Sequence, residues 1–219
     1  MHMTGNIVSL RLYFAALMIG FGVLTASPPT VAAKTILKAD QPSEIARIEA
    51  YLNSVRSVEA GFLQISSGGR VAEGRLYLQR PEQLRLDYRP PATIQIYANG
   101  YWLAFIDTEL EEISQVPLSS TPAGFLVRKR ITLSGDVTVT RIEKRDDQIR
   151  VHLTQTKDPD SGTLALSFAE HPLRLKNWIV TDAQGVRTQV SLINPKFNRL
   201  IDEKYFRYDE NQFENSDHQ

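Results

Sequence analysis

The sequence predicts a mainly β protein with some α: a single curved antiparallel sheet of about eleven strands that forms an incompletely closed barrel. Apolar and polar residues alternate with period two in successive segments between residues 58 and 193, which is typical of strands with one covered face. Short turn sequences such as Asn99-Gly100 separate these segments, so neighbouring strands must be antiparallel. A sheet of this length tends to curl, and two helical segments need room against its concave face, which favours a barrel that stays open.

The first 33 residues are typical of a secretory signal peptide. Arg11 supplies a positive charge, residues 12–24 form an apolar run of 13 residues, and small residues end in Val31-Ala32-Ala33. A membrane-spanning helix needs roughly 20 apolar residues. We expect cleavage after Ala33; cleavage at Ala26 or Ser27, or an uncleaved membrane anchor, is the alternative.

Together with the expected signal peptide, the composition favours a periplasmic domain that its apolar core alone holds together. The chain has 25 acidic and 25 basic residues and no cysteine, which excludes disulfides and a lipid-modified N-terminal cysteine. Nothing in this charge balance favours nucleic acid. We expect one domain over residues 34–208, with its last segment returning through Ile201 and Phe206, and a polar, flexible tail over 209–219.

A helix is expected to open the domain. Asp40 is a suitable N-cap, and Pro42 suits the first helical turn. An apolar stripe with helical spacing follows and predicts that the helix packs on the sheet; it consists of Ile45, Ile48, Leu52 and Val55.

The eleven expected strands are separated by Gly-, Asn-, Asp- and Pro-containing turns. They span residues 58–66, 70–79, 83–88, 93–98, 101–107, 111–117, 136–144, 148–156, 162–168, 173–181 and 186–193. Alternation along the last four strands assigns an inward-facing set of Ile149, Val151, Leu153, Leu164, Leu166, Phe168, Leu173, Leu175, Val190 and Leu192.

A short helix interrupts the strands between Pro117 and Val137. Ser120 or Thr121 can cap it, Pro122 suits its first turn, and residues 125–127 supply an apolar face. Because this helix sits in the middle of the strand series, it must lie over one face or one end of the sheet. We interpret it as a plug or lid.

Catalytic and metal-binding motifs are absent from the sequence. His152, His171 and His218 lack the spacing of a metal site, and no Gly-x-Ser-x-Gly elbow occurs. We therefore expect no catalytic residue, no metal and no cofactor. The basic cluster at residues 128–130 is either a solvated loop or a docking point for an acidic partner or lipid head groups.

The sequence resembles the periplasmic outer-membrane lipoprotein carrier (LolA) family over essentially all of the chain after the signal peptide. An Arg-Pro pair followed by apolar alternation is the most specific part of the likeness. The matching residues are Gly74, Arg80-Pro81, Leu84-Arg85-Leu86-Asp87-Tyr88, Pro91, Asn99-Gly100, Trp102, Gln115-Val116, Thr121-Pro122, Phe125-Leu126, Ile201-Asp202 and Phe206.

The resemblance implies a monomeric carrier in the periplasm of a Gram-negative bacterium. Such a carrier takes acylated lipoproteins from an inner-membrane lipoprotein-releasing ABC transporter and carries their acyl chains to the outer membrane. A separate outer-membrane lipoprotein acceptor is a further partner that the sequence leaves open. The alternatives are an envelope-sensing domain that binds lipoprotein or a protein partner without shuttling, and a hydrolase acting on an envelope lipid or glycan.

The resemblance also implies roles for individual residues. Arg80 is expected to lock the lid in the empty state. Leu84 and Leu86 stand where the family often has an aromatic residue and a tryptophan, and Asn99 replaces a more usual Asp. The expected wall of the lipid-binding cavity, for which plain core packing is the alternative, comprises Leu76, Leu78, Leu84, Leu86, Ile94, Ile96, Trp102, Phe125 and Leu126. Trp102 and Phe105 cannot both face this cavity.

Overall fold

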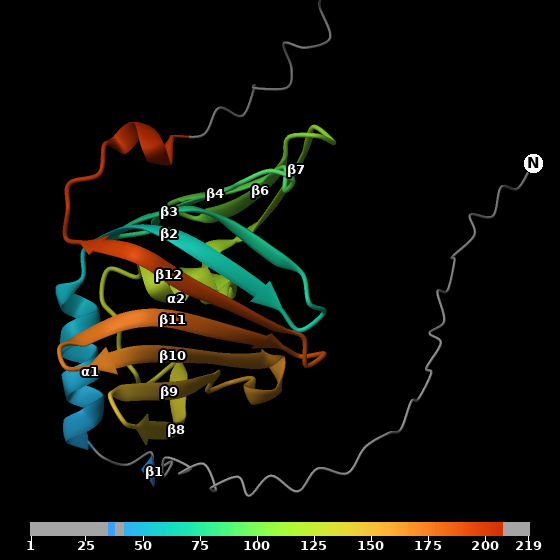
Figure 1. The fold of residues 1–219 in the computed structure, drawn as a ribbon. Helices are drawn as coiled ribbons and strands as arrows, with labels where there is room; N and C mark the ends of the chain where they lie inside the picture. Colours follow the sequence, from blue (N-terminus) through green and yellow to red (C-terminus); the bar gives the residue numbers. More distant parts are fainter. Residues whose placement is uncertain (1–34, 38–41, 208–219) are drawn as a thin grey trace, which may run out of the picture. The chain divides into compact units, whose positions relative to one another are not determined.

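The computed structural model describes residues 35–37 and 42–207. Within these residues it contains one antiparallel sheet in the strand order β1-β8-β9-β10-β11-β12-β2-β3-β4-β5-β6-β7 (Figure 1). The expected signal peptide over residues 1–33, the tail over 209–219 and the N-cap Asp40 lie outside the described residues.

The eleven predicted strands are all present in the sheet. They are β2 Ser57–Ser66, β3 Val71–Gln79, β4 Gln83–Tyr88, β5 Ile94–Asn99, β6 Trp102–Asp107, β7 Glu112–Pro117, β8 Val137–Arg145, β9 Gln148–Gln155, β10 Gly162–Glu170, β11 Leu173–Asp182 and β12 Arg187–Phe197. The sequence missed a twelfth strand, β1 Thr35–Leu37, which pairs with β8. Three residues are too few for alternation to reveal a strand.

The sheet is not closed, as predicted. β7 and β1 are its two edges among the described residues, and the last strand, β12, returns to pair with β2. The connection from β7 to β8 must therefore run from one edge of the sheet to the strand next to the other edge. This connection contains the 3₁₀ turn η1 Leu118–Ser120 and the helix α2 Pro122–Val127, and Figure 1 shows α2 behind β11 and β12, where it covers a face of the sheet.

The N-terminal helix, α1 Pro42–Ser54, packs its apolar stripe on the sheet as expected. Ile48 and Leu52 have 0% and 2% of their surface exposed. Among the described residues, no helix combines the length and the apolar character needed to cross a membrane.

The first turn of α1 is fixed to the sheet by a partly buried group of charges. Glu44 is buried and lies 2.6 Å from Arg47 and 2.9 Å from Lys144 of β8. Lys144 also lies 2.8 Å from Glu170 at the end of β10. These ionic hydrogen bonds hold α1 against two strands at once.

The lid helix α2 has the N-terminus that the sequence predicts. The Thr121 hydroxyl accepts a hydrogen bond of 3.1 Å from the backbone N–H of Gly124, and Pro122 opens the helix. A Cβ atom on Gly124 would lie 2.1 Å from the carbonyl oxygen of Leu118, so only glycine permits this tight approach of η1 to α2.

A β-bulge changes which face of β11 points inward. Phe168 pairs with Leu175, whereas Leu166 pairs with Trp178, so β11 has one extra residue at this point. Strict alternation from Leu175 would turn Ile179 inward. The bulge instead places Trp178 on the same face as Leu166, which is completely buried.

The outer face of the sheet carries a smaller cluster beneath the 3₁₀ turn η3 Glu203–Phe206. Tyr205 stacks on Tyr77 with ring centroids 4.4 Å apart, and the Arg85 guanidinium lies 4.8 Å from the ring centroid of Tyr97. Phe206 is 1% exposed, which confirms the expected return of the C-terminal segment through this residue. The remaining 3₁₀ turn, η2 Pro159–Ser161, precedes β10.

Candidate functional site

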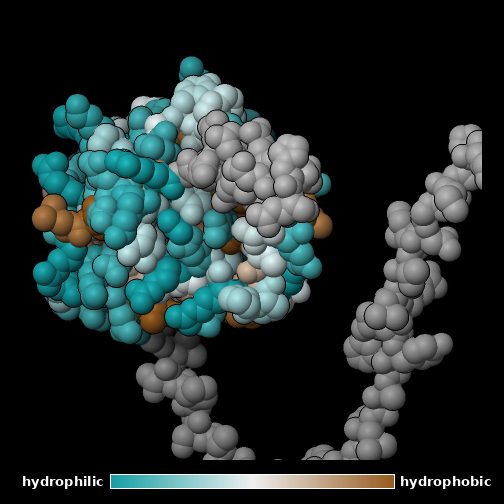
Figure 2. Space-filling view, turned by 90° about the horizontal axis from the view of Figure 1, so that it is seen from above, coloured by the Kyte–Doolittle hydropathy of each residue, from teal (hydrophilic) through white to brown (hydrophobic). Residues whose placement is uncertain are grey.

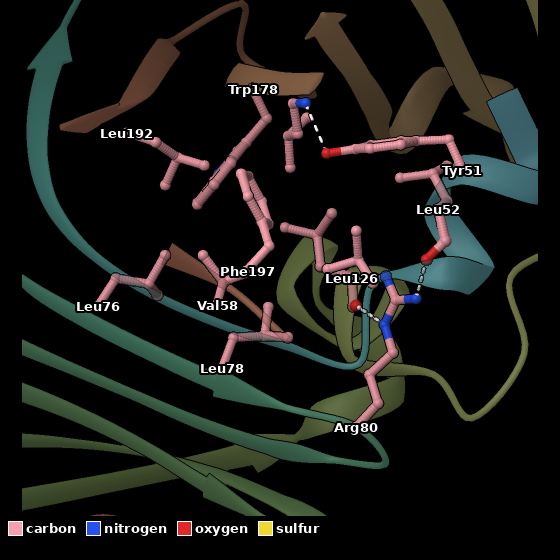
Figure 3. A pocket seen from close by; sticks show the side chains of 12 residues that line it. Tyr51, Leu52, Val58, Leu76, Leu78, Arg80, Leu126, Trp178, Leu192 and Phe197 are labelled. Atoms are coloured by element: carbon pink, nitrogen blue, oxygen red, sulfur yellow. Dashed lines mark hydrogen bonds between the residues drawn. The ribbon is translucent and has the colours of Figure 1, made fainter. Parts of the chain in front are cut away.

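A small apolar cavity lies inside the half-barrel, between the sheet and the two helices (Figure 3). Its volume is about 20 Å³, which is room for about one water molecule. Apart from the Tyr51 hydroxyl and the Arg80 guanidinium, its lining side chains are apolar: Tyr51, Leu52, Val55, Val58, Leu76, Leu78, Arg80, Leu126, Leu175, Trp178, Leu192 and Phe197. The interior of the protein is therefore apolar, but the side chains that line it nearly fill it.

Arg80 connects the sheet to both helices at the edge of this cavity. It follows β3, and its Nε donates a 2.9 Å hydrogen bond to the carbonyl oxygen of Leu126 in α2. Its Nη1 donates to the carbonyl oxygen of Leu52 in α1. Figure 3 shows the guanidinium reaching between the two helices.

Both accepting carbonyls belong to helix C-termini, which explains the choice of residue. The last four carbonyls of a helix have no intrahelical partner and carry the negative end of the helix dipole. A planar guanidinium presents several donors in a fixed fork, so Arg80 can satisfy one carbonyl of each helix at the same time. Burial lowers the pKa of Arg80 to about 10, which still leaves the side chain charged at neutral pH.

The segment that follows α2 is attached to α1 by side chains that the sequence analysis did not identify. Asn53 donates a 2.8 Å hydrogen bond to the carbonyl oxygen of Ile131 and accepts one of 2.9 Å from its N–H. Glu49 accepts a 2.5 Å hydrogen bond from the N–H of Leu133. Polar residues on a helix carry no sequence signal for such contacts.

Most of the predicted wall residues face the interior. Leu76, Leu78 and Leu126 line the small cavity together with Arg80. The others that belong to the same core are Leu84, Leu86 and Phe125, which are buried, and Ile96, which is partly buried and packs against them. The leucines of β3 and β4 lie directly opposite one another across the two strands.

Two predicted wall residues lie outside the buried core. Ala98 of β5 pairs with Leu103 of β6, so Leu103 and Phe105 lie on the inner face of the sheet. Trp102 therefore points to the outer face, and 48% of its surface is exposed. The placement of Trp102 in the cavity wall was therefore wrong, because β6 is apolar on both faces and alternation could not choose between them. Ile94 lies on the inner face but at its margin, 40% exposed.

Several lining residues were missed for identifiable reasons. The bulge on β11 hid Trp178, as described above. The last strand was expected to end at residue 193, but a second bulge after Ile193 lets β12 continue to Phe197. Tyr51 was overlooked beside the apolar stripe of α1; its hydroxyl accepts a 2.9 Å hydrogen bond from the backbone N–H of Leu175.

The apolar interior is not displayed on the face shown in Figure 2. That face is mostly hydrophilic, and apolar residues gather on it only in small separate patches. Among the residues that the structure describes, no group of His, Cys, Asp or Glu is arranged to hold a metal ion. The arrangement suits the reversible burial of an apolar ligand.

The chain is similar in sequence to known carrier proteins. The family model described as "Outer membrane lipoprotein carrier protein LolA" matches residues 53–209. An outer-membrane lipoprotein carrier protein of Pseudomonas aeruginosa is 28% identical over 184 residues, covering 80% of this chain and 88% of the relative. One of Halorhodospira halophila is 27% identical over 204 residues, covering 84% and 90%. The crystal structure of the LolA superfamily protein NE2245 from Nitrosomonas europaea matches 75% of this chain and 97% of its own, with 14% identity and a TM-score of 0.46.

Proposed function

Because this chain belongs to the outer membrane lipoprotein carrier protein LolA family, a family of carriers and not of enzymes, we propose that it carries lipoproteins across the periplasm. In this proposal it binds the acyl chains of lipoproteins released from the inner membrane and transfers them to the outer membrane. The observation that carries the proposal is an apolar interior whose helical cover is held by the hydrogen bonds of one arginine, Arg80.

The physical task requires such an interior. Each buried methylene group contributes about 0.8 kcal/mol, so acyl chains need a continuous apolar surface to stay in water. An apolar cavity of about 150 Å³ accepts no more than a benzene-sized molecule. The cavity of about 20 Å³ is therefore too small for an acyl chain. The interior must expand before an acyl chain can enter.

The helix α2 is the part that we propose to move. It has only six residues and lies in the connection across the open side of the sheet. Its C-terminal end is held by Arg80 and by a 2.8 Å hydrogen bond from the N–H of Glu82 to the carbonyl oxygen of Val127. The longer helix α1, anchored at Glu44, provides the fixed support.

The proposed partners follow from the task. An inner-membrane lipoprotein-releasing ABC transporter would supply the cargo, and an outer-membrane acceptor would receive it. The carrier would be a periplasmic monomer exported with a cleaved signal peptide over residues 1–33. None of the proposed steps needs a cofactor.

The test is release of lipoprotein from membranes. Purified protein is incubated with energised spheroplasts, and the supernatant is assayed for acylated lipoprotein bound to it. We expect a soluble one-to-one complex, visible by native mass spectrometry with intact acyl chains. A protein that releases no lipoprotein but binds a regulatory partner would contradict the carrier role and support a sensing domain.

A further inference from the structure

A second pocket lies at the other side of α2. Its volume is about 380 Å³, far larger than the cavity beside Arg80. Its floor is a row of three aliphatic side chains, Leu153, Leu164 and Val180, which lie opposite one another on β9, β10 and β11. We call this pocket the vestibule.

The lid helix separates the vestibule from the small cavity. Phe125 lines the vestibule, whereas the next residue, Leu126, lines the small cavity. On the sheet side, Val180 lines the vestibule and Trp178, two residues away on β11, lines the small cavity. The two spaces are neighbours, so displacement of α2 would join them into one apolar channel.

The mouth of the vestibule is polar and carries its own ion pair. Arg128 lies 2.6 Å from Asp136, and its guanidinium stands 5.2 Å from the ring centroid of Phe125. Lys157, Asp182 and a set of hydroxyl-bearing residues also line the vestibule; the latter are Ser119, Ser120, Thr121 and Ser161. An aliphatic floor beneath charged groups of both signs and hydroxyls suits a ligand with an apolar chain and a polar ester head.

We propose that the vestibule is the entry site, where one acyl chain of the cargo binds while Arg80 still holds α2. This inference rests on the proposed carrier function. The vestibule already exceeds the volume of about 150 Å³ that holds a benzene, so it can take an alkyl segment without rearrangement. The small cavity can take none until α2 moves.

The order of filling follows from this arrangement. Methylene groups that bind in the vestibule lie against Phe125, the residue that precedes one of the Arg80 acceptors. An acyl chain that extends past this ring displaces α2 and breaks the Arg80 hydrogen bonds. Binding in the vestibule thus comes first, and filling of the inner cavity comes second.

Quenching of tryptophan by a brominated acyl chain tests the order. Trp178 reports on the inner cavity once the outward-facing Trp102 is replaced, in the variant Trp102→Phe. A vestibule reporter combines Trp102→Phe and Trp178→Phe with Phe125→Trp. Each reporter is mixed with bromostearoyl monoglyceride in a stopped-flow fluorimeter, with Arg80 intact or replaced in Arg80→Leu.

With Arg80 intact, we expect quenching in the vestibule reporter at least tenfold faster than quenching of Trp178. With Arg80→Leu, the two rates should become similar. Quenching of Trp178 that is as fast as quenching in the vestibule, with Arg80 intact, would overturn the inference and leave the carrier function standing. If neither tryptophan is quenched, acyl binding itself fails, and the proposed function fails with it.

A matched pair of variants provides an independent measurement. Leu164→Glu places a carboxylate on the vestibule floor, whereas Val186→Glu places one at an exposed position in the turn before β12. In the Trp178 reporter, Leu164→Glu should slow quenching at least tenfold, and Val186→Glu should leave it unchanged. Equal rates in a folded Leu164→Glu protein would contradict entry through the vestibule.

Discussion

The Nε atom of Arg80 lies 2.9 Å from the carbonyl oxygen of Leu126, so the end of a strand holds the C-terminus of the lid helix directly. The same guanidinium reaches the carbonyl oxygen of Leu52 in α1. Hydrogen bonds made by a charged group contribute about 1.5–3 kcal/mol each, which is enough to keep α2 closed and small enough to be overcome by a few buried methylene groups.

Replacement of Arg80 should free the lid without unfolding the sheet. In Arg80→Leu, the free energy of opening α2 should fall by about 2 kcal/mol, or roughly 30-fold in the opening equilibrium. Hydrogen exchange over residues 118–134 measures this change. Arg89→Leu, which removes an arginine at an exposed ion pair, is the control and should leave exchange unchanged.

The same variant should retain its cargo. Without the Arg80 hydrogen bonds the empty state loses stability, so the lipid-bound state is favoured and transfer to outer-membrane acceptors slows. Arg80→Lys keeps a charge but not the planar fork, and we expect an intermediate rate. Transfer of lipoprotein from Arg80→Leu at the rate of the unmodified protein would refute the proposed role of Arg80 in holding α2 closed.

A carboxylate in the inner wall should abolish lipid uptake. Leu84 is 4% exposed and faces Leu78 across β3 and β4, so Leu84→Glu brings an unpaired charge into the apolar interior. Binding of a fluorescent acyl chain, measured after circular dichroism has verified the fold, should disappear. Ile113→Glu, at an exposed position of β7, should bind normally. Undiminished uptake by Leu84→Glu would show that Leu84 lies off the lipid path.

Gly124 should be irreplaceable in the lid. The Cβ atom of Gly124→Ala would stand 2.1 Å from the carbonyl oxygen of Leu118, so η1 and α2 must separate. We expect a loss of about 1–3 kcal/mol in the free energy of unfolding, measured by urea denaturation. Gly68→Ala is the control, because the nearest atom to its added Cβ is 3.9 Å away. A stability equal to that of the control would be incompatible with this packing.

Stability should depend on pH through Glu44. Burial acts to raise its pKa, but hydrogen bonds from Lys144 and Arg47 outweigh burial and hold the pKa below its ordinary value of 4.5. The stabilisation is therefore complete above about pH 4.5 and is lost as the pH falls through the lowered pKa. Relative to the unmodified protein, Glu44→Gln should lose about 1–3 kcal/mol at pH 7 and progressively less on acidification.

Urea denaturation of both proteins between pH 3 and pH 7 measures this difference. Glu112→Gln removes an exposed carboxylate of β7 and serves as the control. A gap between Glu44→Gln and the unmodified protein that stays constant over this pH range would argue against the lowered pKa of Glu44.

Local sequence patterns were sufficient to predict the strands, turns and helices of the fold. The alternation in β3 and β4, the turn at Asn99-Gly100 and the Thr121-Pro122 start of α2 each depend on residues close in sequence, and the structure confirms all three. The open sheet was also predictable, because two helices and one long sheet leave no space for closure. The importance of Arg80 came from family resemblance alone, since an arginine before proline has no distinctive local pattern.

The candidate site was only partly predictable, because it depends on which face each strand presents. One extra residue in β11 exchanged its two faces and brought Trp178 inward, while the doubly apolar β6 turned Trp102 outward. Both outcomes depend on the register with neighbouring strands, which the strand's own residues do not encode.

By itself, the sequence determined a half-open antiparallel sheet with an apolar side and a helical cover, because periodicity and turn chemistry act over a few residues. The tertiary structure alone decided that the inner cavity is nearly closed, that one guanidinium joins two helix ends, and that a larger pocket stands open beside them. Volume and contact between distant segments arise from the packing of the whole chain, and no short stretch of sequence specifies them.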